Sequence, residues 1–313
     1  MVEPKATPGT VAAIIVSYNP DPEEFADLME RIAFQVDFVV VIDNASRQSE
    51  REAICRQTAV FDARLVVNEE NLGLATAQRL GIQAALAAGA DFILLLDQDS
   101  LPAPDMVERL RQAYEQLSAA GEPVAAVGPR KICGPSDQSI PFVRFRIHAA
   151  LKRYCSGSGG LLRTDFLISS GLLAPAWVYE RVGMPEDALF IDNIDLEWCF
   201  RAQHFGLRLF GVCDAVLFHQ IGSQTRYVSM LNNIGPIHIH EPLRQYYQTR
   251  NRFQLYARHY APWAWKIQDF PRALFKLLYF CLMISPRREN LRMMYLAVWD
   301  ALRGVQGPFP HDR

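Results

Sequence analysis

The sequence predicts an α/β fold built on a doubly wound, mostly parallel sheet. Three observations support this class: short apolar runs alternate with helical segments over roughly the first 130 residues, the runs are apolar on both faces, and several of them end in polar residues. Strands that are apolar throughout are typical of parallel sheets covered by helices on both sides. Such sheets bind ligands at the carboxyl ends of their strands, so the polar residues there are candidates for a binding site.

The elements of the first half follow a regular order. The first strand is expected at residues 11–18, and a helix begins after Asp21, a cap candidate that is followed by Pro22 in the first turn. Further strands are expected at residues 37–43, 64–68, 91–97 and 124–128, and helices at residues 74–88 and 104–120, each of which is followed by a glycine.

The second half is less regular. The pattern weakens over residues 131–162, where the GSGG run at 157–160 is typical of a loop. Order returns with an apolar run at residues 166–173, helical spacing over 192–205 and a strand-rich stretch at 207–219. From Glu241 onward the chain is helical, aromatic and basic.

Composition excludes several classes of protein. Half of the residues are hydrophobic and 21% are charged, which rules out wholesale disorder and a collagen-like architecture. The 32 basic and 34 acidic residues give a net charge of −2, which disfavours a net-basic nucleic-acid-binding protein. No run reaches the roughly 20 apolar residues that span a bilayer, and the N-terminus lacks a secretory signal profile. Six cysteines without a CxxC pair disfavour structural zinc and a disulfide framework, so we expect reduced thiols in a cytoplasmic protein.

The sharpest motif is Asp97-Gln98-Asp99, which follows the apolar run LLL. Two carboxylates one residue apart at a strand end can converge on one Mg²⁺ or Mn²⁺, together with phosphate oxygens. A bare DxD tripeptide often occurs by chance, and the alternative is an ordinary acidic strand end before the helix near Pro104.

A second acidic cluster lies in the segment DNIDLE at residues 192–197. On a helix, Asp192 and Asp195 share a face, and one of them could act as a general base. Glu197 has Arg201 four residues further on, so we expect these two to form an ion pair. The alternative is an acidic helix N-terminus that is stabilised by the helix dipole.

Two further features are weaker when taken singly. His219 follows a predicted strand and is either a hydrogen-bonded structural residue or a metal ligand that completes a site begun far upstream. The segment Asn71-Leu72-Gly73 precedes an Ala-rich helix, where glycine permits a close approach of phosphate to the helix N-terminus. The alternative is an ordinary helix cap, and neither GxGxxG nor GxxxxGK[ST] occurs in the sequence.

Eight segments occur in one order along the chain: VSYNP, IDNAS, NLGLATAQRLG, LLLDQDS, FLISSGLL, LFIDNIDLEWCFRA, LFHQIGS and YYQTRN. In this order, over about residues 11–252, they resemble the family 2 glycosyltransferases of the GT-A fold. The FLISSG, LFIDxxDxEW and DQDS forms are most similar to bacterial rhamnosyltransferases, which use dTDP-L-rhamnose. The resemblance implies a glycosyltransferase domain at 1–240, with a nucleotide-sugar-binding half at 1–130 and an acceptor and catalytic half at 131–240, and a helical extension at 241–313.

The resemblance also assigns residues to the donor nucleotide. Asp43 resembles the acidic residue that contacts the nucleoside base. The other donor-binding positions that the resemblance implies are Ser17, Tyr18, Asn19, Asn71, Gly73, Asp97 and Gln98.

The metal and the catalytic base are assigned in the same way. Asp97, Asp99 and His219 resemble the ligands of Mg²⁺ or Mn²⁺, with Asp99 as the direct ligand. Asp195 resembles the base aspartate of the family, and Asp192 is a second candidate for this role. The chain departs from the family at Ile194, where a glutamate usually precedes the base. It departs again at Arg79, where the helix commonly carries an asparagine.

The implied activity is a metal-dependent, inverting transfer of a sugar, L-rhamnose from dTDP-L-rhamnose, to a hydroxyl of a cell-surface glycan or glycolipid precursor. Another donor, such as a UDP-hexose, remains an alternative. A nucleotidyltransferase is disfavoured because no Gly-rich basic loop follows the first strand. A non-catalytic nucleotide-sugar-binding protein is disfavoured because Asp97, Asp99, Asp195 and His219 are all present.

Aromatic and basic residues alternate near the C-terminus. They are Trp263, Trp265, Phe270, Phe275, Tyr279 and Phe280, with Lys266, Arg272, Lys276, Arg287, Arg288 and Arg292. This pattern suits the headgroup interface of a membrane, and equally a helical pair packed on protein. Peripheral contact with the cytoplasmic face of the inner membrane and homo-oligomerisation are therefore both left open, and no nucleic-acid partner is expected.

Overall fold

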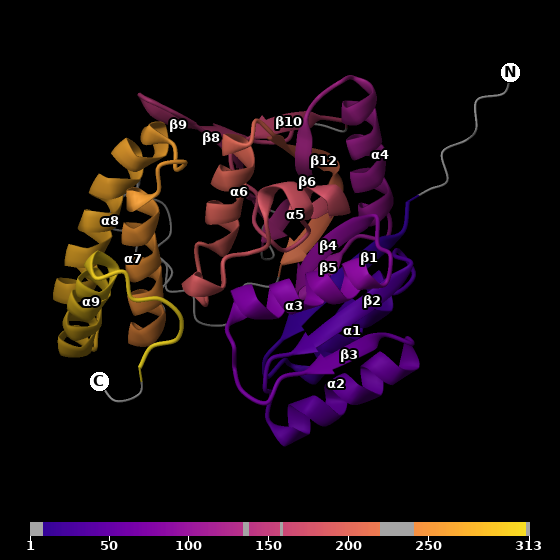
Figure 1. The fold of residues 1–313 in the computed structure, drawn as a ribbon, viewed down its shortest axis with the longest axis horizontal. Coiled ribbons are helices and arrows are strands. Elements are labelled where there is room, and N and C mark those ends of the chain that lie inside the picture. Colours follow the sequence, from indigo (N-terminus) through magenta and orange to yellow (C-terminus); the bar gives the residue numbers. More distant parts are fainter. Residues whose placement is uncertain (1–8, 134–137, 157–158, 220–240, 311–313) are drawn as a thin grey trace, which may run out of the picture.

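The computed structural model describes residues 9–133, 138–156, 159–219 and 241–310 (Figure 1). At its centre is a ten-stranded sheet. The strands are β1 (Val11–Ser17), β2 (Phe38–Asp43), β3 (Arg64–Val67), β4 (Phe92–Asp97), β5 (Ser100–Pro102), β6 (Val124–Cys133), β7 (Gln138–Ser139), β10 (Leu161–Thr164), β11 (Leu173–Pro175) and β12 (Arg208–His219). A separate hairpin is formed by β8 (Phe142–Arg146) and β9 (Ala149–Arg153).

The main path of the sheet runs β10-β12-β6-β11-β4-β1-β2-β3, with β5 beside β12 and β7 beside β6. β1 pairs in parallel with β2 and β4, β2 with β3, and β6 with β12, whereas β10 and β11 are antiparallel to their neighbours. The predicted α/β class with a mostly parallel sheet is therefore confirmed.

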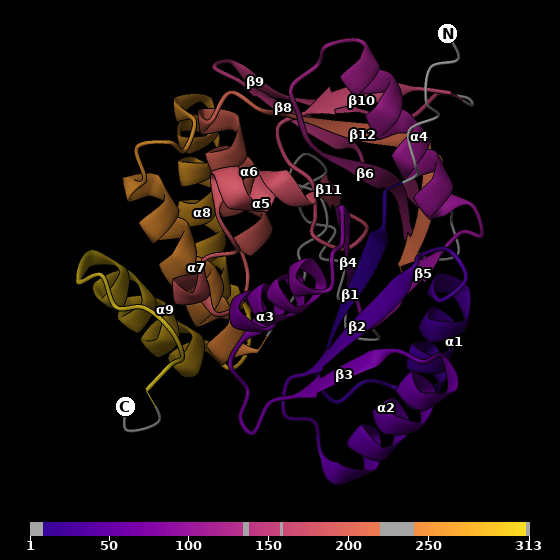
Figure 2. The same ribbon diagram turned by 45° about the vertical axis from the view of Figure 1, so that its right-hand side comes forward.

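Helices cover both faces of the sheet. The helices are α1 (Pro22–Ile32), α2 (Gln48–Val60), α3 (Leu74–Ala87), α4 (Met106–Ala119), α5 (Ala176–Val182), α6 (Ile194–His204), α7 (Pro242–Ala257), α8 (Trp263–Met283) and α9 (Arg287–Leu302), with a 3₁₀ turn at Asp187–Leu189. Side chains of α1, α2 and α4 enter the hydrophobic core on one face, and those of α3, α5 and α6 enter the core on the other (Figure 2).

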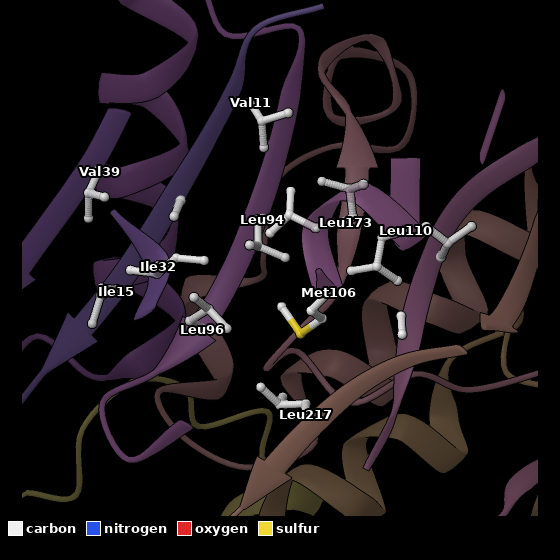
Figure 3. Close-up of a cluster of buried hydrophobic side chains, with 14 of the residues drawn as sticks. Val11, Ile15, Ile32, Val39, Leu94, Leu96, Met106, Leu110, Leu173 and Leu217 are labelled. Atoms are coloured by element: carbon white, nitrogen blue, oxygen red, sulfur yellow. The ribbon is translucent and has the colours of Figure 1, made fainter. Parts of the chain in front are cut away.

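The alternation of side chains along each strand supplies both cores. In β1, Ala13 and Ile15 belong to one cluster, whereas Ile14 belongs to the other. Figure 3 shows the first cluster, in which Ile15 of β1 and Met106 of α4 take part. Burying a side chain of this size contributes about 1.5–3 kcal/mol, which explains why the strands are apolar on both faces.

The register of the parallel strands aligns their carboxyl ends. Ser17 at the end of β1 is paired with Asp43 at the end of β2. Asp97 at the end of β4 is paired with Val16, the neighbour of Ser17. Three polar residues that lie far apart in the sequence are thus brought to one edge of the sheet.

The structure differs from the sequence-based predictions in the middle of the chain. The weakly patterned stretch after residue 131 continues β6 as far as Cys133 and then forms the β8–β9 hairpin. The expected reduced thiols are wrong for one pair, because Cys155 and Cys213 form a disulfide. Their separation of 58 residues gave no spacing signal. Backbone pairing of Cys213 with Gly160, close to Cys155, brings the two together.

The C-terminal helices α7, α8 and α9 form a separate layer beside the sheet (Figure 1). α7 packs along α9, and α8 also contacts α9. Trp265 and Phe280 of the aromatic pattern are buried, and Trp265 packs on Phe200 of α6 and Tyr256 of α7, so part of that pattern serves packing within the protein. Within the described ranges, no helix is both long and apolar enough to cross a membrane.

Candidate active site

The loops after β1 and β4 are joined through Gln98. The amide of Tyr18 donates a hydrogen bond to Oε1 of Gln98 at 2.7 Å, and Nε2 of Gln98 donates to the carbonyl of Tyr18 at 3.3 Å. Asn19 has a left-handed φ of 46°, and its amide donates to the hydroxyl of Ser46. Ser17, at the end of β1, is fully buried. The donor-side residues expected from the sequence therefore lie in one connected set of loops.

Asp43 is fully buried at the end of β2, and both of its carboxylate oxygens are hydrogen bonded. Oδ1 accepts from the amide of Ser46 at 3.0 Å, and Oδ2 accepts from Nε of Arg51 at 3.0 Å. The ion pair and the turn hold the carboxylate at the edge of the sheet. A contact between Asp43 and the nucleoside base of the donor would have to use the lone pairs that these hydrogen bonds do not occupy.

A chain of amide side chains fixes the segment before α3. Nδ2 of Asn44 donates to Oδ1 of Asn71 at 2.9 Å, and Oδ1 of Asn44 accepts from Asn68 at 3.0 Å. Gly73 has a φ of +82°, and a Cβ added to it would lie 2.5 Å from a ring atom of Phe190. Only glycine fits there, because the loop before α6 packs against the N-terminus of α3.

The Asp97-Gln98-Asp99 motif ends β4 and turns into β5. The amide of Asp97 donates to the hydroxyl of Ser170 at 3.3 Å, which places the FLISSGLL segment beside the motif. Ser100, the residue after Asp99, is opposite His219 in the pairing of β5 with β12. The backbone of His219 thus reaches the acidic motif, although its side chain lies outside the described part of the structure.

The carboxylates at this edge of the sheet supply part of a site for a divalent ion. Two carboxylates one residue apart match the oxygen preference of Mg²⁺ and Mn²⁺, which usually keep several waters and bind substrate phosphates. Over the described residues, no group of three or more His, Cys, Asp or Glu side chains could hold a metal ion. Asp97 and Asp99 therefore fit such an ion only with further ligands, which water, diphosphate or His219 would supply.

Asp195 lies in the first turn of α6 and is partly buried. Its Oδ1 accepts a hydrogen bond from the amide of Leu196 at 2.8 Å. Desolvation raises the pKa of Asp195 to about 6, and the negative charges of Asp97 and Asp192 act in the same direction. The structure therefore brings the candidate base close to the first carboxylate of the acidic motif. A carboxylate whose pKa lies near neutrality is suited to general-base chemistry.

Lys131 is a member of the site that the sequence analysis missed. It lies on β6, its side chain is buried, and its positive charge opposes the rise in the pKa of Asp195. Nothing in the local sequence marks it, because it falls in the weakly patterned stretch. The proximity of this lysine to Asp195 can be recognised only once the fold has placed β6 and α6.

Asp192 faces the C-terminal helices. Its carboxylate accepts hydrogen bonds from Nε of Arg244 at 3.1 Å and from Nη2 at 3.3 Å. Gln248 on the same helix, α7, also donates to it at 3.5 Å. Asp192 is thus an ion-paired carboxylate, whereas the sequence analysis treated it as a second candidate base.

Two arginines of the region have structural partners. The predicted ion pair of Glu197 with Arg201 is confirmed, with distances of 2.8 and 2.9 Å, and Tyr260 donates to the same carboxylate at 2.6 Å. Arg79, the residue at which the chain departs from the expected asparagine, is bound by Asp187 at 2.8 Å. This contact explains how an arginine is accommodated on α3.

The first half of the chain, which carries the donor side of the candidate site, is similar to a known family. Residues 12–160 match the family described as glycosyl transferase family 2. This part of the chain is therefore similar to the family 2 glycosyltransferases. The acidic motif and the loops after β1 and β2 lie inside the match, whereas Asp195 and α7 lie beyond its end.

Individual relatives extend the similarity beyond residue 160. The chain is 28% identical over 301 residues to the dTDP-rhamnosyl transferase RfbF of Shigella flexneri, which covers 95% of this chain and 97% of that protein. It is also 28% identical over 254 residues to the galactofuranosyltransferase GlfT1 of Mycolicibacterium smegmatis, covering 77% and 81%.

Among solved structures, the fold is similar to that of GalNAc-T7 crystallised with UDP, GalNAc and Mn²⁺. The TM-score is 0.61 at 12% identity, over 96% of this chain. This chain spans 59% of the length of that protein. At this identity the likeness concerns the fold alone, and it confirms the predicted GT-A architecture.

Proposed function

We propose that the protein transfers L-rhamnose from dTDP-L-rhamnose to a hydroxyl group of a cell-surface glycan or glycolipid precursor, with inversion at the anomeric carbon. The observation that carries the proposed chemistry is the partly buried Asp195, whose pKa is raised to about 6 beside the acidic edge of the sheet. The choice of rhamnose is supported by the similarity to the dTDP-rhamnosyl transferase over nearly the whole length of both chains.

In the proposed reaction, Asp195 removes the proton of the acceptor hydroxyl. The acceptor oxygen then forms a bond to the anomeric carbon while the bond from that carbon to the diphosphate oxygen breaks, and the proton remains on Asp195. Since the pKa is about 6, the carboxylate is ionised at neutral pH and yet more basic than an exposed aspartate. The positive charge of Lys131 favours this ionised form.

The donor would lie along the carboxyl edge of the sheet. We propose that Asp43, Asn71 and Gly73, with Ser17, Tyr18, Asn19, Asp97 and Gln98, border the nucleotide. Asp97 and Asp99, with His219, would hold a Mg²⁺ or Mn²⁺ ion. When bound, this ion supplies positive charge for the leaving diphosphate.

Asp192 takes a supporting role in this proposal. Both of its carboxylate oxygens are engaged by the guanidinium of Arg244, so they are less accessible to an acceptor hydroxyl than those of Asp195. Its charge nevertheless contributes to the raised pKa of Asp195. We therefore assign the base to Asp195 and a role in supporting the base or contacting the acceptor to Asp192.

The deciding experiment offers the protein a panel of sugar nucleotides and measures release of the nucleoside diphosphate. The panel contains dTDP-L-rhamnose, UDP-glucose, UDP-GlcNAc and a galactofuranosyl donor. We expect metal-dependent release with dTDP-L-rhamnose and little with the others. Preference for another donor would overturn the rhamnosyl assignment and leave the glycosyltransferase chemistry intact, whereas binding without release would favour a non-catalytic nucleotide-sugar-binding protein.

We further propose that the outer face of α8 and α9 contacts an anionic membrane surface. Exposed apolar residues recur every three or four positions: Trp263, Ile267, Phe270, Leu274, Leu278 and Leu282 on α8, and Leu291, Tyr295, Trp299 and Leu302 on α9. The exposed charged residues of these helices and the turn after α9 are Arg272, Arg287, Arg288, Arg292, Arg303 and Glu289, an excess of positive charge that complements anionic lipid.

Co-sedimentation with phosphatidylglycerol vesicles tests this surface. We expect binding at low salt that weakens as salt is added, and that the double variant Leu278→Glu/Leu282→Glu loses. Val60→Glu is the matched control, because Val60 is an apolar residue of α2 that is 72% exposed. Absence of binding at low salt, together with a dimer in light scattering, would favour packing between two copies instead.

A further inference from the structure

The loop that leads into α6 has an unusual backbone. Phe190, Asp192 and Asn193 have φ values of 62°, 65° and 61°, in the left-handed region that side chains other than glycine seldom adopt. Such a conformation persists only where the surrounding structure holds it. Since α6 begins at Ile194 and carries Asp195 in its first turn, the contacts that hold this loop also place the proposed base.

The side chain of Asn251 on α7 makes the most direct of these contacts. It is fully buried, and its Nδ2 donates to the carbonyls of Leu189 and Ile191 at 2.8 Å and of Asp192 at 3.0 Å. Three carbonyls of one short loop thus converge on a single amide group. An aliphatic side chain at this position would leave these carbonyls without that donor in the protein interior.

Arg250 holds the same loop from the neighbouring position. It is fully buried, and Nη2 donates to the carbonyls of Ala188 at 3.3 Å and Leu189 at 3.2 Å. Its Nη1 donates to the carbonyl of Gly307 at 2.6 Å, so the C-terminal segment takes part. The guanidinium carbon lies 5.1 Å from the ring centre of Tyr247, a favourable cation–π geometry.

The loop also touches the donor side of the site. The carbonyl of Phe190 accepts a hydrogen bond from the amide of Ala75, in the first turn of α3, at 3.2 Å. On its other side, the ring of Phe190 stacks on Tyr247 of α7 with centroids 5.0 Å apart. The loop is therefore held between α3 and α7, and a shift of the loop would move the proposed base relative to the donor.

We infer that Arg250 and Asn251 form a positioning pair, which fixes the loop at residues 188–193 and through it the catalytic carboxylate of Asp195. This inference rests on the proposed role of Asp195 and extends it to two residues that lie outside the matched family segment. Neither side chain needs to touch a substrate. A misplacement of about 1 Å at a reacting group can cost on the order of 10²-fold in rate, which makes such a pair important for catalysis.

The test compares Asn251→Ala with Gln254→Ala. Gln254 lies on the same helix and is also mostly buried, and its Nε2 donates to the carbonyl of Val305 rather than to the loop. We expect Asn251→Ala to lower kcat by roughly 10–100-fold while the donor KM stays within about twofold. Gln254→Ala should keep kcat within about twofold. A rise in donor KM without a fall in kcat would overturn the inference.

A double-mutant cycle separates positioning from general loss of structure. If Asn251 acts through Asp195, the variant Asn251→Ala/Asp195→Asn should be within about twofold of Asp195→Asn alone. If the two substitutions instead multiply their individual losses of kcat, the inference is overturned. A wild-type kcat in Asp195→Asn would instead refute the proposed base, so the two failures are distinguishable. Should Asn251→Ala not fold, Arg250→Lys removes the loop contacts of the guanidinium fork and should give the same pattern at a smaller size.

Discussion

The two sides of the candidate site are held in different ways. On the donor side, polar side chains are fixed by neighbouring elements of the same sheet edge, as Asp43 is by Arg51 of α2 and Asn44 is by Asn71. On the base side, the loop before α6 is fixed by α7, through Arg244 and Asn251. The comparison teaches that donor binding and base placement depend on different sets of contacts, which meet where Phe190 packs on Gly73 and Ala75, and that the two should be separable by mutations away from that point.

The largest expected effect is on the donor side and comes from removing divalent metal. EDTA should reduce transfer to background, because the leaving diphosphate would lose the positive charge that the ion supplies. Asp99→Ala should have nearly the same effect. Activity is measured as release of nucleoside diphosphate, with Mg²⁺ or Mn²⁺ added back as the control. Full activity in EDTA would remove the metal from the proposed reaction.

The next effect concerns the base side. Asp195→Asn should lower kcat by about 10²–10⁴-fold, the usual contribution of a general base, while donor affinity in calorimetry stays nearly unchanged. Asp192→Asn should be milder and should act mainly on the acceptor KM. If Asp192→Asn were the more damaging to kcat at saturating substrates, the roles of the two aspartates would have to be exchanged.

Asn44→Ala should produce the opposite pattern, with an effect on the donor side. It removes the acceptor that Asn68 and the amide of Leu72 share, so the free energy of unfolding should fall by about 1–3 kcal/mol. The donor KM should rise while kcat changes little. Gln48→Ala is the control, because its contact with Glu52 is exposed. A loss confined to kcat would contradict the separation of the two sides.

The smallest effect is a change in pH dependence. Because the pKa of Asp195 is raised to about 6, kcat should be constant above that pH and fall about tenfold for each unit below it. Lys131→Met removes a positive charge that favours the ionised form, so it should move this acidic limb to higher pH. An acidic limb near the ordinary aspartate pKa in the wild-type protein would show that Asp195 is not the group observed.

Individual residues on both sides could be predicted from the sequence, whereas the long-range contacts that hold the base side could not. Asp97 and Asp99 could be identified because they follow an apolar run that marks the end of a strand. Glu197 and Arg201 could be paired because residues four apart on a helix lie side by side. By contrast, nothing local marks the pairing of Asp192 with Arg244. Long-range contacts of this kind depend on how α7 packs, and no periodicity in the sequence encodes that.

Lys131 and the disulfide between Cys155 and Cys213 were missed for a related reason. All three residues lie in or beside stretches where irregular strands replace the alternating pattern. Burial of a charged group, or closure of a covalent bond, becomes evident only after these strands have been placed. The domain boundary expected at residue 240 stays a prediction, and the contacts of Asn251 with Leu189 cross it.

The bracing of the loop by α7 also has a consequence for the order of synthesis. The strands β1 to β4 leave the ribosome long before residues 250 and 251, so the donor edge can assemble while the loop before α6 still lacks its brace. A nascent chain would then bind nucleotide before it could transfer sugar. The protein would gain catalytic competence only after residues 250 and 251 have emerged, which timed assays on stalled and released chains would reveal.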